Sequence, residues 1–243
     1  MGALLGRGKV LFRPMPQNAA RAMTGRALVI GASGGIGAAL AAALDARGDD
    51  VTGLSRSADG FDMTDPQSVS THMAALEGPF DTILIASGIL SAKDSRPEKS
   101  LAEIDAETMA QVMAVNAIGP ALVLAQIPHL LPRRGRAVAG VLTARVGSIG
   151  DNGLGGWYSY RASKAAANQI VHTAAIEIAR KYPDAAVVAL HPGTVETDFT
   201  RDYPAHRKVS AAQAADNLLH VLDSLTPAQT GQFFDYAGEV IPW

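Results

Sequence analysis

From Arg26 onward, short apolar runs alternate along the chain with longer stretches of helical periodicity. Most of the short runs are apolar without interruption, as in parallel strands that are buried on both faces. Strands that alternate with helices build a parallel sheet with helices on both faces. The sequence therefore predicts an α/β fold with a doubly wound, mostly parallel sheet of about seven strands.

Six strands and five helices can be placed on the sequence. The predicted strands cover residues 27–30, 50–54, 82–86, 137–143, 186–190 and 232–235. The predicted helices cover residues 35–47, 65–76, 105–130, 158–181 and 211–224. With 243 residues, 48% of them hydrophobic, the chain can bury the core of one large domain. We expect a single domain over residues 25–243, without repeats or an internal linker.

Residues 1–24 differ from the rest of the chain in composition. They carry Arg7, Lys9, Arg13 and Arg21 but no acidic residue, and no apolar segment with a cleavage site follows. We interpret them as an untargeted N-terminal extension, which is disordered or arises from a start codon assigned upstream of Met23.

Composition argues against several classes of function. The chain has 21 basic and 23 acidic residues, so it lacks the positive field of a nucleic-acid-binding protein. It has no cysteine, no apolar run near 18 residues and no pair of histidines at metal-ligand spacing. We expect a cytoplasmic protein without a nucleic-acid, membrane or metal partner.

A glycine-rich turn follows the first predicted strand and opens an alanine-rich helix. Glycines let the backbone turn sharply and approach a pyrophosphate, whose charge then lies against the N–H groups of the helix N-terminus. An ordinary strand-to-helix loop is the alternative, but this position in a βαβ unit favours a Rossmann-type dinucleotide site. The expected cofactor-binding residues here are Gly31, Ser33, Gly34, Gly35, Ile36 and Gly37.

The end of the second strand bears on which dinucleotide is bound. An acidic residue there accepts a hydrogen bond from the ribose of NAD, whereas a basic residue pairs with the 2′-phosphate of NADP. The chain has Arg56 at this place and no carboxylate until Asp59. Arg56 could instead be a solvated loop residue, yet the missing carboxylate also favours NADP(H) over NAD(H). Asp62 and Met63 follow where the chain could reach the adenine.

Tyr160 and Lys164 are four residues apart at the start of a predicted helix, so their side chains share one face. An ammonium near a phenol favours the phenolate, and we expect it to lower a pKa that is ordinarily about 10. Carbonyl reduction needs a hydride from the nicotinamide and a proton for the oxygen, which such a tyrosine could supply. An exposed surface pair is the alternative.

In four motifs the sequence resembles the short-chain dehydrogenase/reductase family, and in particular the subgroup of the C-factor signalling protein and the sniffer-type carbonyl reductases. These motifs are the turn of Gly31, Gly35 and Gly37, then Val115-Asn116-Ala117, the Tyr160/Lys164 pair, and His191-Pro192-Gly193-Thr194-Val195.

This resemblance implies a catalytic tetrad of Asn, Ser, Tyr and Lys, and with the NADP(H) indicated by Arg56 we expect a small carbonyl or alcohol substrate. Asn116 would hold a water that links Lys164 to bulk solvent. Further cofactor contacts would come from Ala86, Ser87, Gly88, Pro192, Gly193, Thr194 and Val195. Residues 196–204 would be a substrate loop or a plain surface loop, and Phe199 is assigned no role. Pairing of long helices through small residues would give a homodimer or homotetramer.

The tetrad serine is displaced in this chain. Where relatives carry it, at the end of the strand before Tyr160, the sequence reads Leu142-Thr143-Ala144. Ser148 is the first candidate for the missing hydroxyl. Thr143 is the second, because the alternation of a strand through residue 143 would turn its side chain to the opposite face.

Three functions remain after these observations. The first is an NADP(H)-dependent reductase or dehydrogenase. The second is a dinucleotide-binding signalling or regulatory protein with weak or no turnover, since fold alone does not guarantee activity. A nucleotide-sugar epimerase or dehydratase is disfavoured, because only about 50 residues follow Pro192 for a substrate domain.

Overall fold

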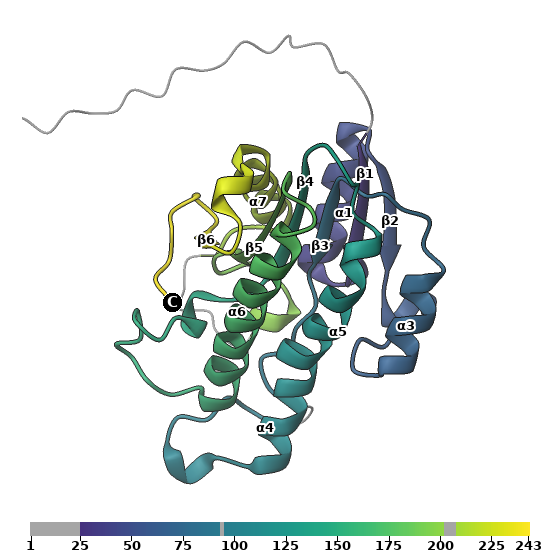
Figure 1. Ribbon diagram of the computed structural model, residues 1–243. Coiled ribbons are helices and arrows are strands. Elements are labelled where there is room, and N and C mark those ends of the chain that lie inside the picture. Colours follow the sequence, from purple (N-terminus) through teal and green to yellow (C-terminus); the bar gives the residue numbers. More distant parts are fainter. Residues whose placement is uncertain (1–24, 93–94, 202–207) are drawn as a thin grey trace, which may run out of the picture.

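The computed structural model describes residues 25–92, 95–201 and 208–243, so the predicted extension at residues 1–24 lies outside the described residues. Six strands form one parallel sheet in the order β2-β1-β3-β4-β5-β6 (Figure 1). Their bounds are β1 Arg26–Ile30, β2 Asp50–Leu54, β3 Thr82–Ile85, β4 Ala137–Leu142, β5 Ala185–His191 and β6 Phe233–Asp235. The doubly wound fold is confirmed, with six strands in the described residues rather than about seven.

The strand order reverses between β1 and β3, which are neighbours although β2 separates them in the sequence. Ile30 pairs with Ile85 and Leu142 with Leu190, so the carboxyl ends of the central strands lie along one edge. In open parallel sheets, ligands bind at this edge where the strand order reverses. The topology therefore places the predicted dinucleotide site and the end of β4 on the same side of the molecule.

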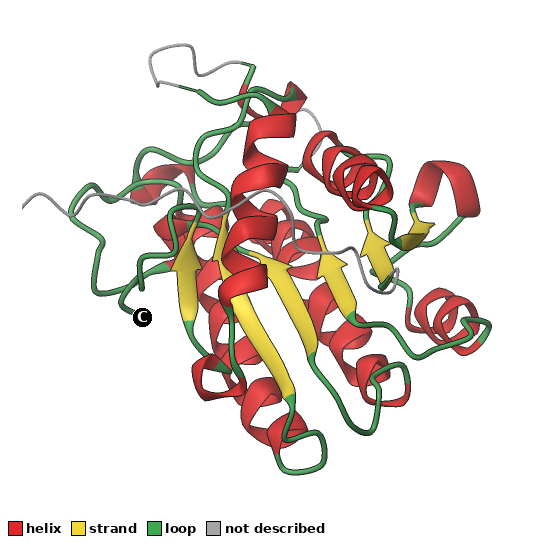
Figure 2. Cartoon of the chain, turned by 90° about the horizontal axis from the view of Figure 1, so that it is seen from above, coloured by secondary structure: helices red, strands yellow, loops and turns green. Residues whose placement is uncertain are grey.

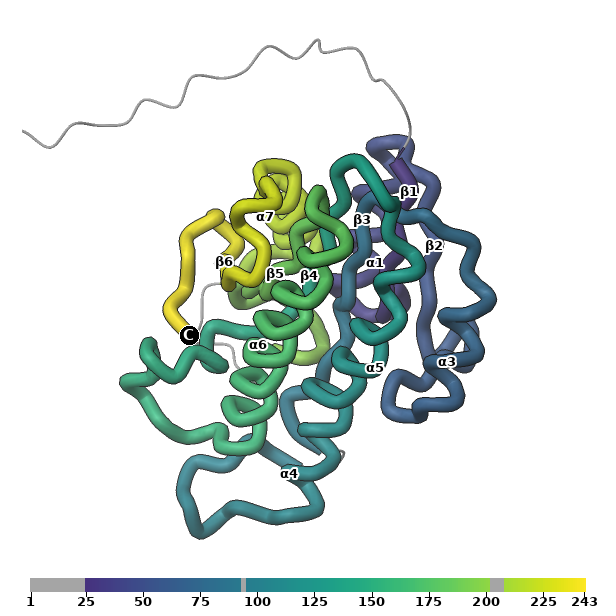
Figure 3. The backbone as a smooth tube through the Cα atoms, in the orientation of Figure 1, coloured from purple at the N-terminus to yellow at the C-terminus, as the bar shows by residue number. Residues whose placement is uncertain are grey.

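Helices cover both faces of the sheet (Figure 2). On one face α1, Gly35–Arg47, packs against α7, Ala211–Ser224, and both share a core with the strands. The opposite face is covered by α3, Pro66–Ala74, α5, Gly119–Gln126, and α6, Tyr158–Ala179 (Figure 3). Shorter helices are α2 Arg56–Asp59, α4 Ala106–Met113, η1 Leu101–Glu103, η3 Ile127–His129, η4 Arg145–Gly147, η5 Asp198–Thr200 and η6 Pro227–Gln229.

The long helix predicted at residues 105–130 is interrupted in its middle by a π-helical turn, Ala114–Ile118. By length and composition the segment Ala106–His129 could cross a membrane, contrary to the expectation that no run in the chain approaches that length. Of its most apolar window, 39% is buried inside the protein, and Val112, Ala117, Val123 and Ile127 are among the buried residues of the segment. Apolar length here is weak evidence for a membrane span.

Candidate active site

The chain passes from β1 into α1 through the predicted glycine-rich turn, and two of its glycines are required by the geometry. Gly31 has a φ of +86°, and a Cβ on Gly37 would lie 2.1 Å from the carbonyl oxygen of Gly31. Gly34, at the N-cap, gives α1 no side-chain cap. The first N–H groups of the helix can therefore receive an anion. This turn fits the phosphates of a dinucleotide.

A cleft of about 930 Å³ opens at the carboxyl edge of the sheet. It brings together most of the residues predicted to bind the cofactor. Those that line it are Ser33, Gly34, Gly35, Ile36, Ala86, Ser87, Gly88, Tyr160, Lys164, Pro192, Gly193, Thr194 and Val195. Gly31 and Gly37 shape the turn without lining the cleft. In the described part of the chain, no group of three His, Asp or Glu side chains could hold a metal ion.

Three further predicted cofactor residues, Arg56, Asp62 and Met63, lie outside the lining of this cleft. Arg56 is exposed at the start of α2, just beyond the end of β2. Asp62 accepts hydrogen bonds from the hydroxyl and the N–H of Thr64, which hold its pKa below the ordinary value. Met63 is buried beside Gly119. Arg56 thus lies beside the edge strand β2, whereas Met63 packs against the start of α5.

Tyr160 and Lys164 lie one turn apart on α6 and both line the cleft. The Lys164 Nζ lies 5.8 Å from the centroid of the Tyr160 ring and donates to the carbonyl of Leu142 at 3.1 Å. Burial lowers the pKa of Lys164 to about 8 and raises the pKa of Tyr160 above its ordinary value. The expected lowering of the tyrosine pKa is therefore wrong, because loss of hydration disfavours a charge on either side chain.

Asn116 lies in the π-helical turn and is fully buried. Its Oδ1 accepts from the N–H of Ile89 at 2.8 Å, and its Nδ2 donates to the Ile89 carbonyl at 2.8 Å and to Ser163 Oγ at 3.0 Å. A Cβ on Gly88 would lie 3.2 Å from Asn116 Oδ1 and 3.3 Å from Lys164 Nζ. The structure thus brings Asn116 and Lys164 together at Gly88, and Asn116 fixes this wall of the cleft.

Ser148, the first candidate for the missing hydroxyl, does not line the cleft. It follows η4, is 1% exposed, donates to the carbonyl of Pro242 at 2.5 Å and accepts from the N–H of Asp151 at 3.0 Å. The bond to Pro242 ties this turn to the segment before Trp243, and the bond from Asp151 lies within the turn. The structure therefore does not bring Ser148 to Tyr160.

Thr143, the second candidate, lines the cleft with Tyr160 and Lys164. It is 4% exposed, and its Oγ1 has no hydrogen-bond partner among the described residues. The alternation that argued against it requires a strand through residue 143, but β4 ends at Leu142. The N–H of Thr143 still donates to Leu190 of β5, and Leu142, Thr143 and Ala144 all line the cleft, so the alternation does not exclude Thr143 from it. A buried hydroxyl without a partner is costly unless a ligand satisfies it.

His191 and Phe199 are among the residues of the cleft that received no role from the sequence. His191 ends β5 beside Thr143, whose N–H donates to the carbonyl of Leu190. Its Nδ1 has no partner within the described residues, and burial, aided by the charge of Arg145, lowers the pKa of its imidazole to about 4. His191 follows a predicted strand and precedes Pro192, a predicted cofactor residue, so its position in the sequence could have marked it as a site residue.

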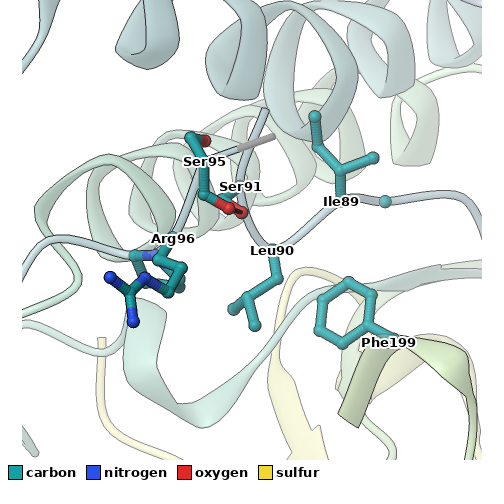
Figure 4. A pocket seen from close by; sticks show the side chains of 8 residues that line it. Ile89, Leu90, Ser91, Ser95, Arg96 and Phe199 are labelled. Atoms are coloured by element: carbon teal, nitrogen blue, oxygen red, sulfur yellow. Dashed lines mark hydrogen bonds between the residues drawn. The ribbon is translucent and has the colours of Figure 1, made fainter. Parts of the chain in front are cut away.

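Phe199 also lines the cleft, and its ring centroid lies 5.9 Å from that of Tyr160. A smaller hollow of about 310 Å³ adjoins the cleft, and the two share Gly88, Leu90 and Phe199. Figure 4 shows Leu90 between Phe199 and Arg96 in this hollow. No pattern in the sequence marks Phe199, because the path of the chain around the short helix η5 decides its contacts.

Several known proteins are similar to this chain in sequence. The profile of the family described as short chain dehydrogenase matches residues 59–208. The chain is 32% identical over 232 residues to 1-hydroxy-2-glutathionyl-2-methyl-3-butene dehydrogenase of Rhodococcus sp. (strain AD45), covering 89% of this chain and 98% of that protein. It is 36% identical over 168 residues to C-signal of Myxococcus xanthus, covering 68% and 94%.

A solved structure has a similar fold over nearly the whole chain. A short-chain dehydrogenase/reductase from Burkholderia multivorans with bound NADP has a TM-score of 0.77 and 27% sequence identity, covering 91% of this chain and 100% of that one. The profile and these relatives agree with the motifs gathered in the cleft, and the chain belongs to the short-chain dehydrogenase family of oxidoreductases.

Proposed function

We propose that this protein reduces a small aldehyde or ketone with NADPH, or oxidises the corresponding alcohol with NADP⁺. One observation carries the proposal: Tyr160, Lys164 and the unpaired hydroxyl of Thr143 lie in the same cleft as the glycine-rich turn. A proton donor, a cation and a hydrogen-bond donor are the groups that reduction of a carbonyl requires from the protein.

NADP(H) is the proposed cofactor, and it would supply or accept the hydride. The geometry of Gly31 and Gly37 fits its phosphates, and the first turn of α1 is open to an anion. The exposed Arg56 follows the end of β2 and is proposed to pair with the 2′-phosphate. The solved Burkholderia multivorans relative binds NADP, which supports the same choice. Asp62 and Met63 are proposed to face the adenine side.

Four residues in or beside the cleft have a proposed part in the reaction. Burial keeps Tyr160 protonated, so its phenol donates a proton to the substrate oxygen as the hydride reaches the carbon. The Lys164 ammonium, with a pKa of about 8, stabilises the phenolate that remains. Thr143 donates a hydrogen bond to the same substrate oxygen and takes the role that was first assigned to Ser148. Asn116 is proposed to help return a proton to Lys164 through a water.

Oxidation of NADPH, followed by absorbance across a panel of aldehydes and ketones, tests the proposal. The panel should include the reverse reaction with a glutathionyl-substituted alcohol, because the Rhodococcus relative is named for such a substrate. We expect Tyr160→Phe to lower kcat by about 10²- to 10⁴-fold. A Tyr160→Phe variant with full activity would refute the assignment.

A matched set of variants separates the two hydroxyl candidates. Thr143→Val should lower kcat by about 10²- to 10³-fold, whereas Thr143→Ser should restore most of it. Ser148→Ala, checked for its folded state by circular dichroism, should keep its activity. The reverse order of effects would return the role to Ser148.

A regulatory protein with weak or no turnover is the second candidate function. It is favoured by the match to C-signal and by Ala144 at the place of the family serine. Tight NADPH binding measured by calorimetry, together with no turnover of any substrate in the panel, would support it.

We also propose that the protein is cytoplasmic and forms a homodimer or homotetramer. Ala162, Ala165 and Ala166 lie on α6 and are exposed or half-buried, so a second helix could approach closely there. Ala167, by contrast, is buried within the chain itself. Light scattering after gel filtration would give the oligomeric state directly.

A further inference from the structure

A short segment between β3 and α4 crosses the start of the helix that carries Tyr160. Glu98 in this segment is 3% exposed, which is unusual for a carboxylate. Its Oε2 accepts from the N–H of Ser159 at 3.2 Å, and its Oε1 accepts from the Ser159 hydroxyl. The carbonyl oxygen of Glu98 accepts from the N–H of Trp157 at 2.5 Å. One residue therefore binds the helix start at three points.

The helix start needs such support because it has no cap of its own. Trp157, at the N-cap of α6, gives no side-chain cap hydrogen bond. Gly155, Gly156 and Trp157 all have φ between 55° and 67°, in the left-handed region. For a bulky residue such as tryptophan this conformation is strained and persists only where the surroundings impose it. Glu98, 61 residues before Ser159, supplies the missing cap.

The capped turn is the one that positions the proposed proton donor. Ser159 directly precedes Tyr160, and the ring of Trp157 lies edge-on to the Tyr160 ring at a centroid distance of 6.1 Å. A shift of the first turn would move both rings. Because catalysis depends steeply on the placement of reacting groups, a small displacement of the phenol would reduce the rate.

We infer that Glu98 is a positioning residue, whose carboxylate caps α6 from a distant segment and thereby fixes the phenol of Tyr160 against the substrate oxygen. It acts through Ser159 and does not line the cleft. Pro97, just before it, lines the hollow next to the cleft, so the segment that supplies the cap also forms part of the wall of that hollow. The inference rests on the proposed function, in which Tyr160 is the proton donor.

Two measurements on Glu98→Ala, Glu98→Gln and wild type test this inference. The first is steady-state kinetics with the best carbonyl substrate. Loss of the cap should lower kcat by about 10- to 100-fold in Glu98→Ala. The KM for NADPH should stay within about twofold, since the glycine-rich turn is remote from Glu98. Glu98→Gln keeps one acceptor oxygen for the Ser159 N–H, and its NH2 group can donate to the Ser159 hydroxyl oxygen, so this variant should recover most of kcat. Glu107→Ala, an exposed glutamate on α4, is the matched control and should behave as wild type.

The second measurement is amide hydrogen exchange by mass spectrometry, which needs no turnover. Exchange in a peptide covering residues 154–164 should rise in Glu98→Ala and remain near wild type in Glu98→Gln. Unchanged exchange in Glu98→Ala would refute the inference that Glu98 caps α6. Raised exchange with an unchanged kcat would overturn the positioning role. Wild-type protein without turnover would refute the proposed function, while the exchange data would still decide whether Glu98 caps the helix.

Discussion

Acid should destabilise this protein through His191. Burial at the end of β5 lowers the pKa of its imidazole from 6.5 to about 4, with Arg145 adding to the effect and Asp235 opposing it. Between these two pH values the unfolded chain binds a proton that the native protein does not bind. The free energy of unfolding therefore falls as the pH decreases through this window. At about 1.4 kcal/mol per pKa unit, the loss amounts to about 3 kcal/mol at pH 4.

Urea unfolding of wild type and His191→Asn at pH 7, 6, 5 and 4 isolates this contribution, because the other titrating groups are shared. Relative to the variant, wild type should lose about 3 kcal/mol between pH 7 and pH 4, and the difference should be constant above pH 7. His220→Asn is the matched control, since that imidazole is exposed on α7. A wild-type-to-His191→Asn difference that stays constant down to pH 4 would refute the argument from burial.

Three further predictions concern the proposed activity. Lys164 has a pKa of about 8, so its ammonium loses its proton as the pH rises through 8, and the rate of carbonyl reduction should fall there. A profile of kcat/KM against pH would show this fall. A profile that stays flat up to pH 10 would contradict the prediction. Gly37→Ala places a Cβ 2.1 Å from the Gly31 carbonyl and should weaken NADPH binding by about tenfold or more in a fluorescence titration. Gly153→Ala, with nothing within 4 Å of the added Cβ, should leave that affinity unchanged. Arg56→Ala should weaken NADPH binding by about 10- to 100-fold and leave NADH binding unchanged, whereas Arg47→Ala, which removes a distant ion pair with Asp223, should affect neither.

The elements that sequence reasoning placed correctly have local signals at their ends. The predicted bounds of α1 and α7 agree with the structure residue for residue. Gly48, in the left-handed conformation, ends α1, and the hydroxyl of Ser210 accepts from the N–H of Gln213 at the start of α7. Such caps depend on a few neighbouring residues, so the sequence alone can reveal them.

The choice between Ser148 and Thr143 could not be made in this way, because it depends on contacts across the fold. Pro242, 94 residues after Ser148, provides the carbonyl that holds the Ser148 hydroxyl away from the cleft. Thr143 lies in the cleft with Tyr160 and Lys164, and this cleft forms only when elements far apart in the sequence pack together. Likewise, the sign of the Tyr160 pKa shift follows from burial, which the spacing of Tyr160 and Lys164 does not contain.

The absence of a side chain at Gly88 matters to the cofactor, to Asn116 and to Lys164 at once. The sequence predicted it as a cofactor contact only, because glycine lets the backbone approach a dinucleotide. In the fold, Asn116 Oδ1 and Lys164 Nζ lie 3.2 Å and 3.3 Å from the position that a Cβ would take there. Any side chain at residue 88 would press on the amide that fixes Ile89 and on the ammonium beside Tyr160. The glycine therefore serves the proposed proton transfer as much as the cofactor.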